Sequence, residues 1–284
     1  MNILILGSTG FLGKKILHVL RERNYSIYEA SRYDFISKDG LLSISDSLKK
    51  KLNQSNFIIN CIANTNFMNC EQENMQSIAN VLIPKKISDY VNEQTYLIHI
   101  SSDVFYENSS NNSDELSKVN SNNSYSLQKE TSEIFFKEKN SLILRTSFLG
   151  YNHRKIGLLN HIYSSLESNK KIEGWGNVIS SSVSIHHLVG LIHKIIDEKI
   201  NIYGIYNFGT LEPYSKYDYI LAILKLFKRE DLVNKIIHTN DLNNRNINSG
   251  MSSRKIKEKL GIRLPILNDV VLDGFKDINQ LSNS

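Results

Sequence analysis

Short apolar runs alternate with amphipathic stretches along the first half of the chain. The runs have the length of buried strands and fall at residues 3–6, 25–30, 57–60, 95–100 and 142–144. The stretches have apolar residues at helical spacing and fall at residues 11–23, 41–52, 71–91 and 124–139. We expect the third of them to be one long helix, although it contains Pro84. Strands that alternate with helices predict an α/β fold with a doubly wound parallel sheet and right-handed crossovers.

The alternation becomes less regular past residue 150. Helical patterns lie at residues 156–168, 185–197, 215–228 and 265–279, and short strand-like runs lie at 170–172, 203–208 and 235–238. No internal repeat and no Pro/Gly-rich linker separates the two halves. We expect residues 1–150 to form a first domain, which 183–208 rejoins. Residues 151–182 and 209–284 then form a small cap over the C-terminal edge of its sheet.

The segment 107–123 is polar and rich in Asn and Ser, with almost no apolar anchor. Such a composition is typical both of a disordered loop and of a lid over a binding site. We expect this segment to be mobile without a ligand, and its composition leaves the two interpretations open.

A glycine-rich turn, GSTGFLG at residues 7–13, follows the first apolar run and precedes the first helical stretch. A turn without Cβ atoms lets the backbone approach a pyrophosphate, and the helix N-terminus supplies N–H groups and the positive end of a dipole. A tight turn without a ligand is the alternative. We expect a dinucleotide site whose contacting residues are Gly7, Ser8, Thr9, Gly10, Phe11, Leu12 and Gly13.

The second apolar run ends at Ser31 and Arg32, about twenty residues past the glycine turn. NAD-binding proteins of this kind have an acidic residue there, which binds the ribose 2′-hydroxyl. Arg32 can instead pair with a 2′-phosphate, so we expect NADPH as the cofactor, in preference to NADH, with Ser31 and Arg32 in contact with it. The alternative is that Arg32 is only a surface charge.

Tyr125 and Lys129 lie four residues apart near the start of the stretch 124–139. On a helix this spacing places both side chains on one face. A free tyrosine titrates near ~10, and a neighbouring ammonium lowers that pKa, so the pair can exchange a proton near neutral pH. Ser102 follows the fourth strand, at the edge where open α/β sheets bind ligands, and its hydroxyl can polarise a carbonyl. Such Tyr/Lys pairs also occur by chance, and the glycine turn together with Ser102 favours the catalytic interpretation.

The composition narrows the range of partners. The 284 residues include 34 Lys or Arg and 29 Asp or Glu, without a basic stripe interleaved with aromatics, so we expect no nucleic-acid partner. No apolar stretch reaches the length of a membrane span and the first strand begins at residue 2, so we expect no membrane association and no leader. Only Cys61 and Cys70 are present, which indicates a reducing, cytoplasmic location. No motif has metal-ligand spacing, so we expect no metal.

Several segments resemble the extended short-chain dehydrogenase/reductases. Asn80 and Pro84 stand in an N-x-x-x-P arrangement, and the other segments are GSTGFLG at 7–13, INCIANTNFMNCEQE at 59–73, ISSD at 100–103, YSLQK at 125–129, LRTS at 144–147 and GWGNVISSSVSIHHL at 174–188. Within that family the chain is similar, over nearly its whole length, to the dTDP-4-dehydrorhamnose reductase-like group. The resemblance implies an NADP-binding Rossmann domain and a small C-terminal substrate-binding domain.

The resemblance also implies roles for individual residues. Tyr125 would donate the proton, Lys129 would tune it and hold the nicotinamide ribose, Ser102 would orient the carbonyl, and Asn80 would support a proton relay. Residues bordering the cofactor would be Cys61, Ile62 and Ala63. Residues towards a nucleotide-linked sugar would be Asp103, Val104, Trp175, Asn177 and Ser180. The chain departs from the family pattern at Ser126 (usually glycine), Gln128 (usually small and polar) and Ser43 (usually aspartate).

We therefore expect an NAD(P)-dependent oxidoreductase that reduces a nucleotide-linked keto sugar with NADPH, in deoxysugar or surface polysaccharide biosynthesis. A sugar-nucleotide epimerase of the same fold and a non-catalytic nucleotide-sensing subunit are the alternatives. A 4,6-dehydratase is disfavoured because Val104, and no second carboxylate, follows Asp103. The oligomeric state is open, with a homodimer as the candidate assembly.

Overall fold

The computed structural model describes residues 1–36, 41–104, 106, 112–238 and 247–282. They form two compact units. Unit 1 comprises Met1–Phe105, Ser121–Arg145 and Val189–Tyr206, and unit 2 comprises Tyr106–Asn120, Thr146–Leu188 and Asn207–Ser284. From the sequence we assigned cofactor binding to residues 1–150 with 183–208, and substrate binding to residues 151–182 with 209–284. That assignment stays a proposal.

Unit 1 is built on a six-stranded sheet in the order β10-β5-β4-β3-β1-β2. The pairs from β2 across to β5 are all parallel. The strands are β1 (Asn2–Leu6), β2 (Ser26–Ala30), β3 (Phe57–Asn60), β4 (Tyr96–Ile100), β5 (Ser141–Thr146) and β10 (Gly204–Phe208). In β1, residues 3–6 are fully buried, because helices cover both faces of a doubly wound sheet. The predicted fold class is confirmed.

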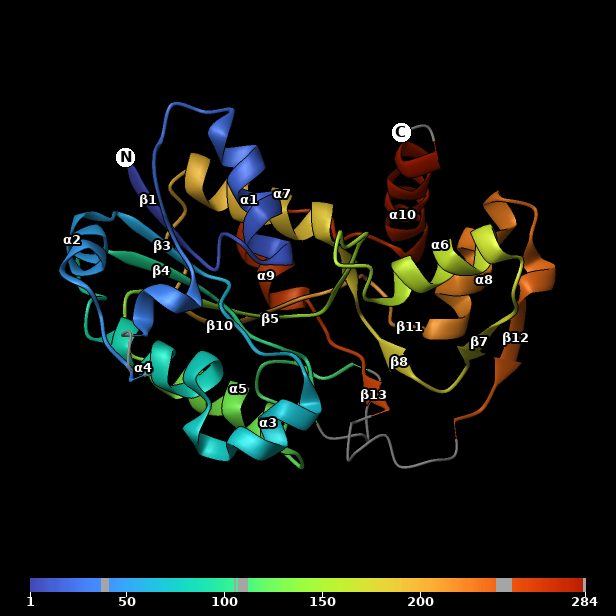
Figure 1. Cartoon of the computed structure of the whole chain (residues 1–284), viewed down its shortest axis with the longest axis horizontal. Helices are drawn as coiled ribbons and strands as arrows, with labels where there is room; N and C mark the ends of the chain where they lie inside the picture. Colours follow the sequence, from blue (N-terminus) through green and yellow to red (C-terminus); the bar gives the residue numbers. More distant parts are fainter. Residues whose placement is uncertain (37–40, 105, 107–111, 239–246, 283–284) are drawn as a thin grey trace. The chain divides into compact units, whose positions relative to one another are not determined.

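Helices lie on both faces of this sheet, with α1 and α7 on one and α4 and α5 on the other (Figure 1). They are α1 (Phe11–Arg21), α2 (Asp46–Gln54), α3 (Phe67–Glu73), α4 (Ile83–Ser88), α5 (Ser124–Ile134) and α7 (Ile185–Asp197). One core of unit 1 joins α2 and α4 to the sheet through Leu48, Leu52, Ile83 and Ile87.

The expected single helix over 71–91 is wrong. The chain forms α3, a short 3-10 turn at Asn74–Gln76, a π-turn at Ile78–Leu82 and then α4, which begins with Pro84 in its first turn. Asn74 adopts a φ of +47°, which ends α3, and the non-helical Ser77 starts the next segment, where its hydroxyl accepts a hydrogen bond from Asn80 N–H. A proline fits this restart because the first helical positions need no N–H donor.

Unit 2 has a core of its own, formed mainly by α6 (Leu158–Ser168), α8 (Lys216–Leu226) and α10 (Leu267–Ser282). A further helix of this unit, α9 (Arg254–Leu260), was not expected from the sequence. Short strands complete it: β6 (Phe148–Leu149), β7 (Ile172–Trp175), β8 (Ile179–Ser180), β9 (Val183–Ser184), β11 (Tyr214–Ser215), β12 (Val233–Ile236) and β13 (Asn248–Ser249).

We expected residues 107–123 to form a mobile loop. Residues 107–111 of this segment lie outside the described residues. Residues 112–120 belong to unit 2, where Val119 pairs with Tyr106 and Ser113 pairs with Met251, and residues 121–123 belong to unit 1. Among the described helices, none combines the length and the apolar character that crossing a membrane requires.

Candidate active site

The strand order reverses between β1 and β3, because β2 lies on one side of β1 and β3 on the other. Open α/β sheets bind ligands outside the carboxyl ends of the strands at such a switch point. The glycine turn after β1 lies there, against the first residues after β3. A Cβ atom on Gly7 would come within 3.1 Å of the Cys61 carbonyl carbon and the Ile62 nitrogen. The predicted cofactor residues of these two segments are therefore neighbours.

The glycine turn is too tight for larger residues. Gly7 has a φ of +86°, and a Cβ atom on Gly13 would lie 2.1 Å from the Gly7 carbonyl oxygen. Gly10 is the N-cap of α1, where no side chain makes a cap hydrogen bond and no acidic residue lies in the first turn. These features fit a pyrophosphate, because the backbone approaches closely and the helix N-terminus presents N–H groups and a positive dipole end.

The end of β2 lies beside the same turn. The Ala30 carbonyl oxygen accepts hydrogen bonds from Gly7 N–H at 2.7 Å and Ser8 N–H at 3.3 Å. Ser31 and Arg32 follow directly, so the pair chosen from the sequence for the ribose end of the cofactor lies next to the glycine turn. Arg32 Nη2 donates to the Tyr33 hydroxyl at 3.0 Å, and its guanidinium carbon lies 4.9 Å from the centroid of the Tyr33 ring.

Lys129 is buried, and its ammonium donates to the Ile100 carbonyl oxygen at 2.8 Å. Burial lowers the pKa of Lys129 from 10.5 to about 8, while the electrostatic interactions with Glu133 and then Cys61 act to raise it. Desolvation raises the pKa of the Cys61 thiol to about 12, with the Lys129 charge opposing it. The lysine thus reaches the carboxyl end of β4, two residues before Ser102, and interacts with the residue that follows β3.

Tyr125 lies one helical turn before Lys129 on α5 and is 7% exposed. Its ring packs on Phe67, with the centroids 4.8 Å apart and the planes at 47°. Ser102 is also nearly buried. Tyr125 and Lys129 therefore lie on α5, and Ser102 lies just after β4. The hydrogen bond from Lys129 to Ile100 joins these two elements.

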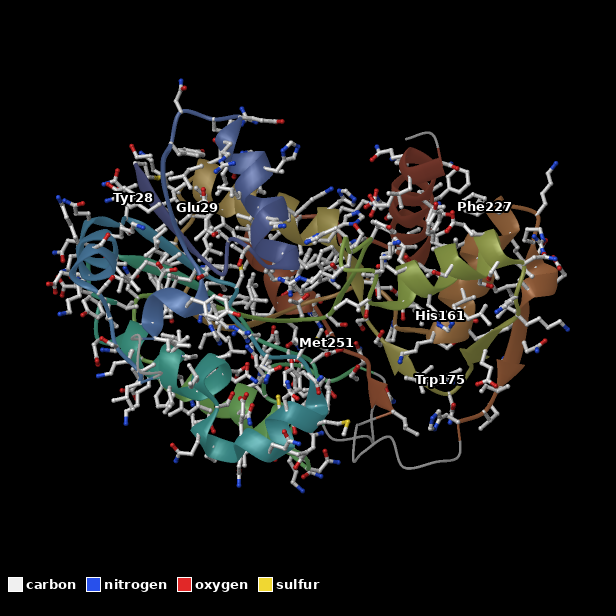
Figure 2. The ribbon with its side chains drawn as sticks, viewed as in Figure 1. Tyr28, Glu29, His161, Trp175, Phe227 and Met251 are labelled. Carbon is white, nitrogen blue, oxygen red and sulfur yellow. The ribbon has the colours of Figure 1, made fainter. Side chains whose placement is uncertain are left out.

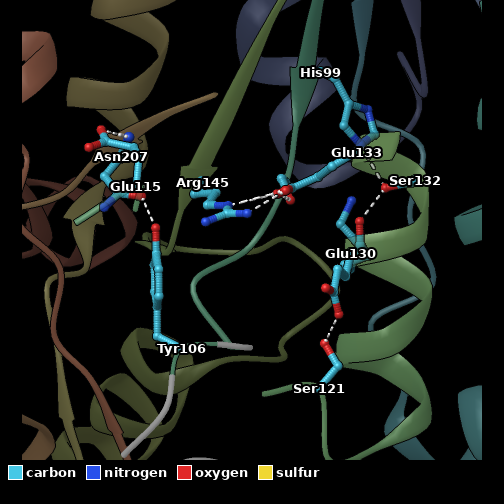
Figure 3. Close-up of polar contacts among 11 residues, drawn as sticks. His99, Tyr106, Glu115, Ser121, Glu130, Ser132, Glu133, Arg145 and Asn207 are labelled. Atoms are coloured by element: carbon cyan, nitrogen blue, oxygen red, sulfur yellow. Dashed lines mark hydrogen bonds and ion pairs between the residues drawn. The ribbon is translucent and has the colours of Figure 1, made fainter. Parts of the chain in front are cut away.

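Glu133, whose charge acts on Lys129, belongs to a buried ion pair. Arg145 on β5 contacts both carboxylate oxygens of Glu133, with Nη2 to Oε2 at 2.7 Å and Nε to Oε1 at 3.0 Å (Figure 3). Ser101 Oγ donates to Glu133 Oε1 at 2.5 Å. A buried carboxylate needs such partners, and this one fixes α5 to the ends of β4 and β5.

A second buried chain of polar groups passes through His99, which the sequence analysis missed. His99 Nε2 lies 3.0 Å from Ser132 Oγ (Figure 3). Asn60 Nδ2 lies 3.1 Å from His99 Nδ1, and Ser132 Oγ donates to the Lys129 carbonyl oxygen. Burial, and then the Lys129 charge, lower the pKa of His99 well below 6.5, so the ring is neutral. The available signal was a lone histidine inside the apolar run of β4.

Gln128 and Asn80 join α5 to the segments after β3. Gln128 Nε2 donates to the Cys70 and Asn74 carbonyl oxygens at 2.9 and 2.5 Å, and its Oε1 accepts from Asn80 Nδ2 at 2.8 Å. Asn80 Nδ2 also donates to the Asn64 carbonyl oxygen, and Asn80 Oδ1 accepts from Asn64 N–H. Both amide protons of Asn80 are thus engaged. This geometry gives Asn80 a holding role, and its part in a proton relay stays a prediction.

The remaining predicted residues fall into two groups. Asp103 and Val104, the first buried and the second partly exposed, directly follow Ser102 in unit 1. Trp175, Asn177 and Ser180 belong to unit 2, where Trp175 ends β7 (Figure 2).

Trp175 has an aromatic and a cationic neighbour in unit 2. Its ring lies 4.6 Å from the His238 ring and 4.4 Å from the Lys216 ammonium. Asn177 fixes the position of His238, because its side-chain amide donates to the His238 carbonyl oxygen and accepts from the His238 N–H, both at 2.9 Å.

The glycine turn at the switch point, with Tyr125 and Lys129 on α5, defines an extended short-chain dehydrogenase/reductase of the RmlD-like group, as predicted. The chain belongs to the family described as RmlD substrate binding domain, whose model matches residues 1–278. No curated protein sequence matches the chain.

Solved structures with the same fold include a dTDP-4-dehydrorhamnose reductase from Clostridium acetobutylicum ATCC 824, with 20% identity, a TM-score of 0.84, and coverage of 99% of this chain and 100% of that one. A dTDP-4-dehydrorhamnose reductase from Bacillus anthracis strain Ames, in complex with NADP, has 18% identity, a TM-score of 0.81, and coverage of 97% and 98%. A UDP-glucuronic acid 4-epimerase from Bacillus cereus, in complex with UDP-glucuronic acid and NAD, has 17% identity, a TM-score of 0.78, and coverage of 99% and 100%.

Proposed function

We propose that this protein reduces the keto group of a nucleotide-linked sugar, with NADPH as the preferred reductant, as a dTDP-4-dehydrorhamnose reductase-like enzyme. Membership of the RmlD family and the reductases among its structural neighbours support this substrate class. The observation that carries the proposal is the buried Lys129, one helical turn after Tyr125, with its ammonium held at the end of β4. A role in deoxysugar or surface polysaccharide synthesis and a cytoplasmic location stay part of the proposal.

When bound, NADPH supplies a hydride to the carbonyl carbon of the substrate. Negative charge then develops on the carbonyl oxygen, and Tyr125 would donate its phenolic proton to that oxygen. Lys129 would favour the ionised phenol through its positive charge and would hold the nicotinamide ribose. Ser102 would donate a hydrogen bond to the same oxygen, which stabilises the charge where it forms.

The proposed substrate residues of unit 2 suit an anionic, ring-containing ligand. Trp175 offers an aromatic face, and the Lys216 ammonium beside it offers a positive charge. We propose that these two residues, with Asn177 and Ser180, contact the nucleotide-linked sugar. Asp103 and Val104 keep the same proposed role from their place after Ser102.

The test is single-turnover NADPH oxidation with a panel of nucleotide-linked keto sugars, with product stereochemistry read by NMR. Tyr125→Phe keeps the ring that packs on Phe67 and removes only the hydroxyl. We expect the variant to bind NADPH normally and to lose ~10²–10⁴-fold in turnover. Tyr163→Phe is the matched control, since that hydroxyl contacts only Glu167 on its own helix α6 among the described contacts. A Tyr125→Phe enzyme with near wild-type turnover would falsify the assignment.

The epimerase alternative has a distinct signature. An epimerase of this fold regenerates its cofactor in each cycle, so the purified protein would retain tightly bound NAD and would interconvert sugar nucleotides without net NADPH oxidation. That result would replace the reductase proposal, and the structural likeness to the Bacillus cereus epimerase makes it the comparison to run. A protein that binds cofactor but turns over no sugar nucleotide would point to the regulatory alternative.

A further inference from the structure

Asp34 follows Arg32 and Tyr33 at the proposed cofactor site, and the proposed function gives it no role. The segment Arg32–Phe35 forms one 3-10 turn immediately after β2. Phe35 is fully buried in the core of unit 1, which anchors this turn. Asp34 is therefore held at the carboxyl end of β2, where the ribose-binding residue of a dinucleotide fold belongs.

The Asp34 carboxylate folds back onto Ser31. Asp34 Oδ2 accepts from Ser31 N–H at 2.6 Å and from Ser31 Oγ–H at 2.9 Å. The same Ser31 oxygen accepts from Tyr33 N–H at 3.2 Å, which completes a capping box. The hydroxyl proton and the N–H of Ser31 are thus both directed at a carboxylate, and neither is directed at an incoming phosphate.

Two opposite charges therefore flank Ser31. Arg32 suits the 2′-phosphate of NADPH, because a guanidinium binds phosphate through paired, charge-assisted hydrogen bonds. Asp34 suits the 2′-hydroxyl of NADH, because a carboxylate accepts a hydrogen bond from a hydroxyl and repels a phosphate. The prediction of NADPH preference from the sequence considered only the first of these charges.

We propose that Asp34 is a determinant of cofactor selectivity, which opposes Arg32 and narrows the preference for NADPH over NADH. The proposal rests on the dinucleotide site of the proposed function and adds to it a residue that neither the motifs nor the resemblance had assigned. Asp34 is exposed, so its effect is a moderate one that salt screens.

The test measures dissociation constants for NADP⁺ and NAD⁺ by titration calorimetry, without any sugar substrate. Asp34→Asn removes the charge and keeps an acceptor for both Ser31 donors. We expect NADP⁺ to bind about 3- to 10-fold more tightly than to the wild type, and NAD⁺ to bind about 2- to 5-fold more weakly. The gain for NADP⁺ should shrink when the salt concentration is raised from about 0.05 to about 0.5 M, because salt screens the repulsion between exposed charges.

Two variants bracket this result. Arg32→Ala should weaken NADP⁺ binding and leave NAD⁺ binding nearly unchanged, the opposite change in the ratio. Asp218→Asn is the matched control, because Asp218 closes the same capping box with Ser215 at the start of α8. It loses the same charge and the same kind of cap, and we expect it to leave the ratio of the two constants unaltered.

The outcomes separate the possible roles of Asp34. If Asp34→Asn changes both constants by one common factor, with a lower melting temperature like that of Asp218→Asn, Asp34 is only a helix cap and the proposal is overturned. If the wild type binds neither nucleotide, the dinucleotide site itself is refuted, and the selectivity proposal fails with it. If both nucleotides bind and the ratio shifts as stated, the selectivity proposal stands even where no keto sugar is turned over.

Discussion

The buried Lys129 makes the pH dependence of turnover a sharp test of the proposed chemistry. Its pKa of about 8 means that about 90% of the side chains carry the proton at pH 7 and about 10% at pH 9. If the ammonium is needed for Tyr125 to act, kcat/KM should fall about tenfold between these two pH values, along a limb centred near 8. Stopped-flow NADPH oxidation at subsaturating sugar nucleotide, from pH 6 to 9.5, measures that limb.

Glu133→Gln tests whether the limb belongs to Lys129. The negative charge of Glu133 raises the pKa of Lys129 against the effect of burial, so its removal should move the limb to lower pH by about one unit. Glu130→Gln is the matched control on α5, since the Glu130 carboxylate contacts Ser121 at 2.6 Å and is not among the charges that act on Lys129 (Figure 3). Circular dichroism across the same pH range checks that each variant stays folded.

Two results would refute the reasoning. A kcat/KM that stays level up to pH 9.5 in the wild type would mean that no group with a pKa near 8 controls the reaction. A limb at the same pH in wild type, Glu133→Gln and Glu130→Gln would mean that the controlling group is not Lys129. The wild-type profile stands as a test by itself, should the loss of the Glu133–Arg145 pair prevent folding.

Two further predictions concern stability. Burial keeps His99 neutral in the native state while the unfolded chain binds a proton below pH 6.5, so stability is lost as the pH falls. The free energy of unfolding should therefore decrease by about 1.4 kcal/mol between pH 7.5 and 5.5 because of this ring, and urea denaturation of His99→Gln should not show that decrease. Gly13→Ala places a Cβ atom 2.1 Å from the Gly7 oxygen and should destabilise the protein by about 1–3 kcal/mol or prevent folding. Gly190→Ala in α7 has nothing within 4 Å of its Cβ atom and should stabilise the protein by about 0.5–1 kcal/mol, so equal melting temperatures for the two variants would contradict the packing argument.

The sheet of unit 1 was predictable because its signal is local. Residues 3–6 and 57–60 are unbroken apolar runs, and strands buried on both faces need that pattern. The helix expected over 71–91 failed because long-range contacts decide that segment: the carbonyl groups of Cys70 and Asn74 accept hydrogen bonds from Gln128, about 55 residues away. Periodicity within a window cannot register such a partner. Helix α9 was missed because only Ile256 of its seven residues is buried.

The candidate site shows the same division. Tyr125, Lys129 and the glycine turn follow from spacing, since a helix places positions i and i+4 on one face and a tight turn needs glycine. The groups that set the electrostatics of the site come from other elements. His99, Arg145 and Asp34 act through contacts on Ser132, Glu133 and Ser31, and two of these three contacts join separate strands and helices. Only Asp34 lies close enough in sequence to its partner for a capping motif to be read directly.

The departures from the family pattern at Ser126 and Gln128 have a physical explanation in this chain. Ser126 N–H donates to Asn123 Oδ1 and Ser126 Oγ donates to the Asn123 carbonyl oxygen, both at 2.8 Å, so this serine fixes the first turn of α5 beside Tyr125. Gln128, fully buried, reaches three partners on the segments that follow β3, which a short side chain such as serine could not span. A glycine at 126 would keep the hydrogen bond from its N–H to Asn123 but would lose the hydroxyl half of the capping box, and a small residue at 128 would leave the Asn80 amide without one of its acceptors. Both replacements thus hold the helix that carries Tyr125 and Lys129, and they leave the two reacting groups themselves unchanged.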